Sequence, residues 1–326
     1  MRAAVLTAYG SPPAVVEREA PVPGPGQVAV RVTAAPIAPL DLLCATGTSY
    51  FGPPALPYVP GVQGVGVLDS GSRVFFSTSA GMAPGDGSLA ERAVAAEADL
   101  VPVPGDVPDE LVAALGLSAV AAWMALTWRA GLRPGERVLV LGAGGTVGQV
   151  AVQAAAALGA SAVVAASRRS AARRRALDRG ATAAVDLAPP AGPDADRRDG
   201  VTELAERMRE AAGGPVDVIV DPVGGDTATA ALLALGEHGR LVHLGASGGP
   251  TATFSSAALR GGSHAILGYT NNALDPAQKA AALTAVLELA AAGRCDVTRE
   301  TVGLAAVADA WTRAGAAPDG RLVVLP

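Results

Sequence analysis

The feature that most constrains the fold is a glycine-rich turn that joins the apolar run 138–141 to an alanine-rich segment. Glycine is needed where a tight turn takes unusual dihedral angles and where the backbone must approach a pyrophosphate, and the following helix offers free N–H groups to that anion. A plain strand-to-helix turn would use the same glycines, but this context favours dinucleotide binding. The residues expected to contact the cofactor here are Gly142, Gly144, Gly145, Thr146, Val147 and Gly148.

From residue 137 the chain alternates between strand-like and helix-like segments. Strands are expected at 137–141, 162–166, 183–186, 216–221, 240–245 and 265–268, and helices at 147–158, 170–179, 201–212 and 226–235. The continuous apolar strands indicate burial on both faces, as in a parallel sheet covered by helices on each side. Six such strands predict a doubly wound α/β sheet. The Pro- and Asp-rich segment 188–200 is expected to be an exposed loop.

The chain on either side of this region has a different character. Its first hundred residues contain short predicted strands, for example 27–34 with alternating apolar positions, which Pro and Gly separate. This pattern indicates an irregular β-rich barrel or sandwich. An Ala-rich helix is expected to begin near Pro108 and to continue to Arg129, and a helix at 276–292 and a strand at 321–325 follow the alternating region.

The end of the second strand of the sheet indicates which nicotinamide cofactor the chain binds. NAD enzymes place an acid there for the ribose 2′-hydroxyl, whereas this chain has Ser167 and Arg168 and no carboxylate until Asp178. A hydroxyl and guanidinium groups bind a 2′-phosphate with charge-assisted hydrogen bonds. The sequence therefore predicts NADPH. The alternative is that the arginines at 168–175 form the solvated face of a helix, and this interpretation is favoured for Arg173, Arg174 and Arg175.

Composition excludes several other classes of protein. The 326 residues are enough for two domains, and a net charge of −5 with a pI near 5.3 argues against nucleic-acid binding. The two cysteines, Cys44 and Cys295, provide neither a disulfide framework nor a cysteine zinc site. No signal peptide and no uninterrupted apolar span are recognised, so we expect a cytoplasmic protein that binds a small-molecule substrate without a membrane.

Several motifs spread over the chain identify a family. They lie at residues 1–5, 36–47, 60–66, 71–74, 132–140, 221–225 and 320–324. Together they resemble the zinc-independent, quinone oxidoreductase-like branch of the medium-chain dehydrogenase/reductase superfamily. The resemblance implies a GroES-like catalytic domain formed by residues 1–120 and 268–326 and a Rossmann domain formed by 121–267. It also implies an interdomain cleft for the nicotinamide and the substrate, and a homodimer.

Departures from the zinc alcohol dehydrogenases of this superfamily are informative. Ala38 stands at the position of their cysteine ligand, Val62 and Gln63 replace their His-Glu pair, and the lobe of four cysteines that holds their structural zinc is absent. Ala and Val side chains cannot donate electron pairs to a metal. We therefore expect no metal. The zinc-free enzymes of the family often carry Asn near the position of Ala38 and Tyr near that of Leu43, and because both are missing here, the resemblance implies an unusually apolar substrate pocket.

The candidate catalytic residues are Asp41, Tyr50 and Gln63, and each has a structural alternative. Asp41 also fits the cap of a short helix, Tyr50 a lining position in a Gly/Pro loop, and Gln63 the satisfaction of a turn. His243 is expected to be a hydrogen-bonded core residue. The resemblance places Val223 and Gly224 against the nicotinamide side, where the strands of an open α/β sheet end, although Pro222 and the glycines could instead only end the strand. Gly245 is a further candidate cofactor residue.

The expected activity is NADPH-dependent transfer of hydride to a quinone or an α,β-unsaturated carbonyl (enone) substrate. Without zinc the chain lacks the Lewis acid that alcohol oxidation uses, whereas conjugation lets the charge that develops during reduction spread onto oxygen. Two alternatives remain at this stage. One is an enoyl reductase or a tailoring enzyme of secondary metabolism on the same scaffold, and the other is an NADPH-binding regulatory or structural protein without turnover.

Overall fold

The computed structural model describes residues 1–188, 197–316 and 319–326, and these form two compact units. Unit 1 comprises Met1–Leu117, Pro276–Ala291 and Val297–Pro326, and unit 2 comprises Ser118–Asp275 and Ala292–Asp296. The sequence placed the boundaries at 120 and 268. It did not anticipate that the short segment Ala292–Asp296 returns to unit 2.

Unit 2 contains a six-stranded parallel sheet in the order β10-β9-β8-β11-β12-β13. The strands are β8 (Arg137–Leu141), β9 (Ala162–Ser167), β10 (Ala183–Asp186), β11 (Val216–Asp221), β12 (Leu235–His243) and β13 (Ala265–Gly268). The order reverses direction between β8 and β11, which is the topological switch point of a doubly wound sheet. The predicted fold of this region is confirmed.

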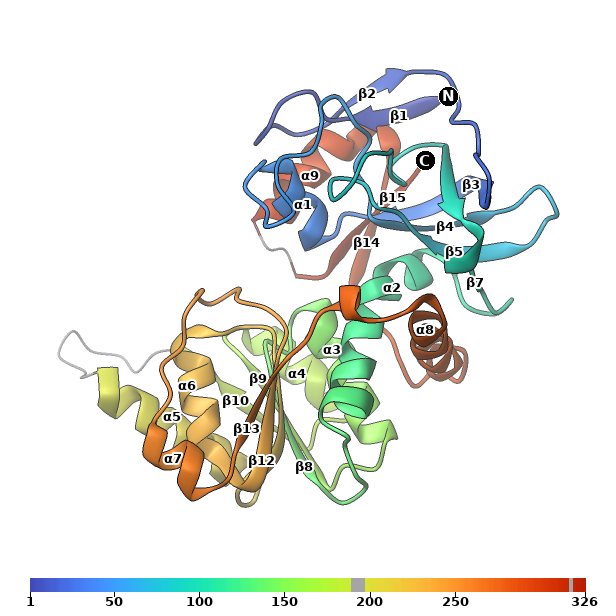
Figure 1. The fold of residues 1–326 in the computed structure, drawn as a ribbon. Helices are drawn as coiled ribbons and strands as arrows, with labels where there is room; N and C mark the ends of the chain where they lie inside the picture. Colours follow the sequence, from blue (N-terminus) through green and yellow to red (C-terminus); the bar gives the residue numbers. More distant parts are fainter. Residues whose placement is uncertain (189–196, 317–318) are drawn as a thin grey trace. The chain divides into compact units, whose positions relative to one another are not determined.

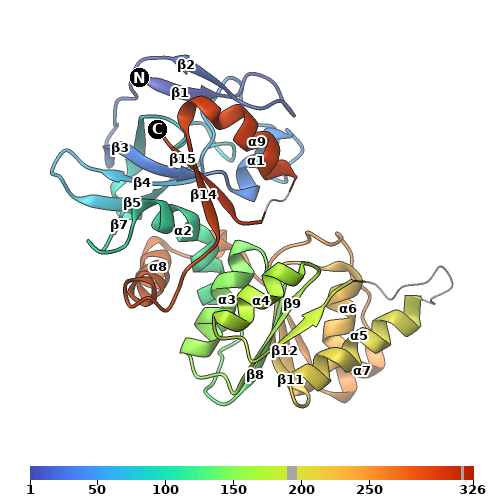
Figure 2. The ribbon, with the colours of Figure 1, turned by 180° about the vertical axis from the view of Figure 1, so that it is seen from behind.

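Helices cover both faces of this sheet. They are α3 (Thr146–Ala157), α4 (Ser170–Asp178), α5 (Arg197–Ala211), α6 (Gly225–Ala234) and α7 (Ser256–Gly261). Figures 1 and 2 show α3 and α4 on one face and α5 and α6 on the other. The apolar strands are buried for this reason, and Leu139, Ile219 and Leu241 share one core cluster. Helix α5 begins inside the segment predicted to be a loop, and most of that segment lies outside the described residues.

Unit 1 is built on a mixed sheet in the order β14-β15-β3-β4-β5-β7, with β6 paired to β3. Its strands are β3 (Gln27–Pro36), β4 (Gln63–Val67), β5 (Arg73–Ser77), β6 (Arg92–Ala96), β7 (Val101–Pro102), β14 (Arg299–Gly303) and β15 (Arg321–Leu325). A two-stranded sheet of β1 (Arg2–Val5) and β2 (Ala14–Glu17) and the helices α1 (Pro39–Ala45), α8 (Pro276–Ala291) and α9 (Val307–Gly315) complete it. The late strand β15 therefore pairs with early strand β3 and does not join the sheet of unit 2.

Helix α2 (Asp109–Met124) continues as one π-helical turn to Arg129, and its backbone is broken at Gly116 (φ 35°, ψ −133°). By length and hydropathy the segment Asp109–Arg129 is able to cross a membrane, which the sequence analysis did not expect. However, 72% of its most apolar stretch is buried inside the fold. We therefore interpret α2 as a core helix.

Candidate nucleotide-binding site

The glycine turn after β8 has the geometry that the sequence predicted for it. Gly142 has a φ of +64°, and a Cβ on Gly148 would collide with the carbonyl oxygen of Gly142, so both positions require glycine. Gly145 is the N-cap of α3, and as a glycine it has no side chain that could cap the helix. The first N–H groups of an α-helix have no partner within the helix. The start of α3 therefore fits an anionic group such as a pyrophosphate.

The end of β9 lies beside this turn. A Cβ on Gly144 would lie 3.0 Å from the Cβ of Ala172 and 3.4 Å from the Oγ of Ser167, so the end of β9 comes close to the turn. The Ser167 side chain is buried, and its Oγ accepts a hydrogen bond from the backbone N–H of Arg169 (3.3 Å). Arg168 is exposed. Ser167 and Arg168 thus adjoin the turn as the cofactor prediction requires.

The interpretation of Arg173 as part of a solvated helix face is wrong. Its guanidinium group donates a hydrogen bond to the carbonyl oxygen of Ser167 (2.7 Å) and forms a 2.8 Å ion pair with Asp186 at the end of β10. The Arg173 side chain is only 19% exposed. Arg174, in contrast, is exposed. The signal that sequence reasoning missed is Asp186, which becomes a neighbour of Ser167 only through the pairing of β9 with β10.

The turn after β11 is organised by the carboxylate of Asp221, which is completely buried. Its Oδ1 accepts hydrogen bonds from the backbone N–H groups of Val223 (2.9 Å) and Gly224 (2.8 Å). A Cβ on Gly142 would lie 3.0 Å from Val223 Cγ2, and one on Gly245 would lie 2.9 Å from the Pro222 carbonyl oxygen. The predicted cofactor residues therefore lie together at the carboxyl ends of the parallel strands β8, β9, β11 and β12.

His243 occupies the end of β12, where it is the register partner of Asp221. Its Nδ1 lies 2.7 Å from Asp221 Oδ2, which confirms the expected hydrogen bond. The expectation that it is a core residue is wrong, because 42% of its side chain is exposed. Sequence reasoning missed this pair as a candidate because the two residues meet only through the register of β11 and β12.

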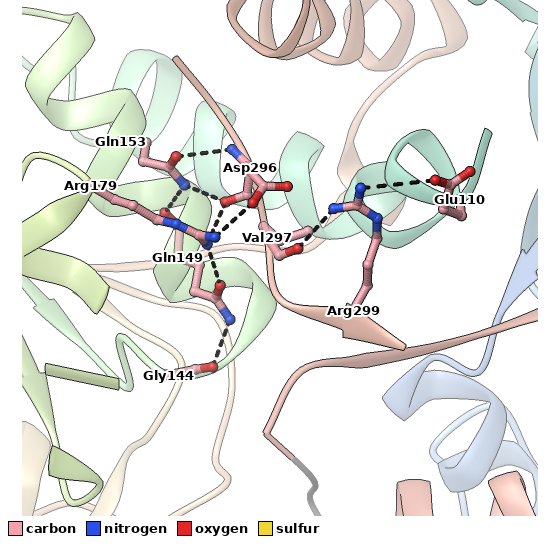
Figure 3. A network of polar contacts seen from close by, with 8 residues as sticks. All are labelled: Glu110, Gly144, Gln149, Gln153, Arg179, Asp296, Val297 and Arg299. Carbon is pink, nitrogen blue, oxygen red and sulfur yellow. Dashed lines mark hydrogen bonds and ion pairs between the residues drawn. The ribbon is translucent and has the colours of Figure 1, made fainter. Parts of the chain in front are cut away.

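A second polar network ties the returning segment Ala292–Asp296 to unit 2 (Figure 3). Arg179 donates to the carboxylate (2.6 Å) and to the carbonyl oxygen (2.9 Å) of Asp296, and also to Gln149 Oε1 (3.1 Å). The amide nitrogen of Gln149 in turn donates to the Gly144 carbonyl oxygen (2.9 Å). Gln153 exchanges two hydrogen bonds with the Asp296 backbone. Through Gln149, this network connects the returning segment to the backbone of the glycine turn.

Of the candidate catalytic residues in unit 1, Asp41 is buried inside a cage of backbone donors. Its carboxylate accepts hydrogen bonds from the N–H groups of Ala38 (2.8 Å), Gly61 (3.0 Å) and Val62 (2.8 Å). The bond from Ala38 closes the first turn of α1, so the capping alternative is confirmed. Burial raises the pKa of Asp41 to about 6, while the three backbone bonds and the charge of Arg321 oppose this rise.

Gln63 and Tyr50 have contrasting environments. The buried amide of Gln63 bridges the break in α2, since its Nε2 donates to the Ala113 carbonyl oxygen (3.1 Å) and its Oε1 accepts from the Leu117 N–H (2.7 Å). Tyr50 is 76% exposed and packs against the ring of Phe51. The hydrogen bonds of Asp41 and Gln63 go to backbone groups and do not join these two side chains to each other or to Tyr50.

The metal prediction concerns two further positions of unit 1. Ala38 and Val62 are both buried, and their side chains offer no donor atom. Within the ranges that the structure describes, no three His, Cys, Asp or Glu side chains come together in a way that would hold a metal ion. The donor chemistry around residues 38 and 62 therefore does not fit a catalytic zinc ion.

These features define the class of protein to which the chain belongs. A parallel sheet with its switch point between β8 and β11, a glycine turn and an uncapped helix N-terminus at that point are the features of a Rossmann-type nucleotide-binding unit. In this chain the unit is inserted between the segments of a second, β-rich unit.

Comparison with known proteins identifies the family. A family profile described as zinc-binding dehydrogenase matches residues 146–273. The mouse quinone oxidoreductase-like protein 2 is 32% identical over 260 residues, which cover 78% of this chain and 71% of that protein. A mycobacterial quinone oxidoreductase (25% identity, TM-score 0.87) and the Thermus thermophilus quinone oxidoreductase, solved also with NADPH (29%, 0.82), match over the full length of both chains. The chain belongs to the medium-chain dehydrogenase/reductase superfamily, as a quinone oxidoreductase-like member.

Proposed function

We propose that this chain, an NAD(P)-dependent oxidoreductase by its family, binds NADPH and transfers hydride from it to a quinone or an enone without zinc. The observation that carries the proposal is the pair Ser167 and Arg168 at the end of β9, beside the glycine turn. The nearest acid on the neighbouring strand, Asp186, is neutralised by its ion pair with Arg173. Among the residues that the structure describes at the ends of β9 and β10, a 2′-phosphate would therefore meet a hydroxyl and a cation, and the one carboxylate there, Asp186, is paired.

In this proposal, different residues of unit 2 bind different parts of the cofactor. The N–H groups at the start of α3 bind the pyrophosphate, Ser167 and Arg168 bind the 2′-phosphate, and Val223, Gly224 and Gly245 contact the nicotinamide side. When bound, NADPH supplies the hydride. The matched relatives that are called quinone oxidoreductases support this assignment.

The lack of donor atoms at residues 38 and 62 limits the kinds of substrate on which the chain can act. Although the matching family profile is named for zinc, alkyl side chains stand at residues 38 and 62. A quinone or an enone does not require a Lewis acid for reduction, because its conjugated system spreads the developing negative charge onto oxygen. Oxidation of an alcohol, in contrast, would have to proceed without the metal ion that polarises the alcohol oxygen. The donor set therefore favours a conjugated acceptor.

The test uses the purified wild-type chain. Titration with NADPH and NADH at one ionic strength should show tighter binding of NADPH, and NADPH should be consumed when benzoquinones or simple enones are added. Elemental analysis of protein purified without added metal should find no stoichiometric zinc. Equal affinity for the two cofactors would overturn the NADPH assignment. Binding of NADPH without turnover on any acceptor would favour a regulatory or structural protein instead.

A further inference from the structure

The His243–Asp221 pair has the geometry of a proton-transferring dyad. Asp221 is completely buried, and its Oδ2 holds the Nδ1 of His243 at 2.7 Å. The other carboxylate oxygen holds the N–H groups of Val223 and Gly224. The imidazole therefore has a fixed orientation in which Nδ1–H points to the carboxylate and Nε2 is left for another partner. A Cβ on Gly224 would lie 3.5 Å from the Cε1 of His243, so the ring adjoins the turn proposed to contact the nicotinamide.

The proposed reaction needs a proton as well as a hydride. Addition of hydride to an enone or a quinone leaves a negative charge on oxygen, which a general acid must neutralise. In unit 1, Asp41 and Gln63 have their polar atoms occupied by backbone groups. His243 is half-exposed and lies at the carboxyl end of the sheet, where the predicted cofactor residues also lie.

We propose that His243, oriented by Asp221, is the general acid of the reaction, an inference that rests on the NADPH-dependent reduction proposed above. Hydride from the bound NADPH forms the new C–H bond at the β-carbon of the enone. The electron pair of the C=C bond forms a double bond between the α-carbon and the carbonyl carbon, and the π pair of the C=O bond moves onto oxygen. The Nε2–H bond of the imidazolium then breaks as the O–H bond of the enol forms. His243 becomes neutral with its remaining proton on Nδ1, and a proton taken up from the solvent restores Nε2–H, so each turnover consumes one proton.

Few ionisable groups surround His243 in the described part of the chain. Asp221 on β11 is the ionisable group in contact with the ring. The adjoining turns 222–225 and 244–249 contain no ionisable residue, and the nearest ones along the chain on the packed elements are Asp226 at the start of α6 and Tyr269 after β13.

The first test does not depend on turnover. The chain has three histidines, so the ring nitrogens of ¹⁵N-labelled protein can be followed individually by NMR. NADP⁺ should shift the ring signals of His243 and leave those of His238 unchanged, because His238 lies elsewhere on β12 and is exposed. The fragment 2′,5′-ADP, which has no nicotinamide, should leave both unchanged. If saturating NADP⁺ does not shift His243, or if 2′,5′-ADP shifts it equally, the inference is wrong.

The second test is kinetic and uses the variants His243→Asn and His238→Asn. An asparagine can still donate to Asp221 but cannot titrate, so His243→Asn should lower kcat about 100-fold or more while the Kd for NADPH stays within about twofold. The kcat of the wild type should fall as the pH rises and the acid loses its proton, and the variant should lose this dependence. His238→Asn should behave as the wild type. A wild-type kcat in His243→Asn would overturn the inference, whereas a wild type without turnover would overturn the proposed function.

Discussion

Arg168 and Arg173 lie on the same short stretch of chain and have opposite environments. The side chain of Arg168 is exposed beside the glycine turn, whereas Arg173 is fixed between the end of β9 and Asp186. A charged side chain that is already paired inside the protein gains little from a ligand. Of the two, Arg168 is therefore the one expected to discriminate between NADPH and NADH.

Replacement of Arg168 by alanine should weaken the binding of NADPH and leave the binding of NADH nearly unchanged. A hydrogen bond to a charged group contributes about 1.5–3 kcal/mol, which corresponds to a roughly tenfold to hundredfold change in Kd. Salt screening at this exposed rim shifts the effect towards the lower value. Fluorescence titration of both cofactors at one ionic strength measures it. Arg174→Ala is the matched control, and an equal loss in both variants would show that general surface charge is responsible.

Asp41 gives a prediction for the dependence of stability on pH. Its pKa is about 6 in the folded chain and 3.8 for the free side chain, so the folded state binds the proton more tightly. The stabilisation from this proton is fully present below about pH 4 and is lost as the pH rises through about 6. Relative to Asp41→Asn, the wild type should lose up to about 3 kcal/mol of unfolding free energy between pH 4 and pH 7. Denaturant unfolding of both proteins measures this difference, and a difference independent of pH would contradict the raised pKa.

At the scale of single elements, the sequence predicted the sheet of unit 2 well. Strands such as β8 contain continuous apolar runs, here at 138–141, and this local signal does not depend on the rest of the chain. The break of α2 at Gly116 has no such signal, because one glycine in an apolar run is compatible with an unbroken helix. The Asp221–His243 pair and the role of Arg173 were also missed. Both depend on which strands become neighbours, and sequence spacing does not give this information.

The β8–turn–α3 element depends on Gly148, which lets the first turn of α3 pack against the backbone of Gly142. In Gly148→Ala the new methyl group would collide with a backbone oxygen that cannot move without shifting the turn. Overpacking of this kind costs about 1–3 kcal/mol, and the displaced turn should weaken NADPH binding at least tenfold. The control is Gly261→Ala at the end of α7, where an added Cβ meets no atom within 4 Å. Titration with NADPH compares the two variants, and wild-type affinity in Gly148→Ala would refute the proposed role of the turn.

At the scale of the whole molecule, the two edges of the sheet in unit 2 are β10 and β13. An edge strand presents unpaired N–H and C=O groups that can bind another strand. We propose that the chain is a homodimer joined along β13, in line with the family resemblance. Light scattering after gel filtration should then give twice the chain mass of 32.1 kDa. Leu267→Pro on β13 should give the monomer mass, whereas Ala184→Pro on β10 should leave the dimer intact. Loss of the dimer in the second variant alone would contradict the proposal.

The insertion of unit 2 between the segments of unit 1 has a consequence for the chain as it emerges from the ribosome. Arg321 of β15 donates to the carbonyl oxygen of Ile37, across 284 positions of sequence. At synthesis rates of about 5–20 residues per second, this interval lasts roughly 15 s to 1 min. Throughout that time the part of β3 that pairs with β15, Ala35 and Pro36, lacks this neighbouring strand, while the six strands of unit 2 are made without interruption. The nascent chain therefore carries a nearly complete nucleotide-binding unit while the mixed sheet of unit 1 still lacks its last strand, β15.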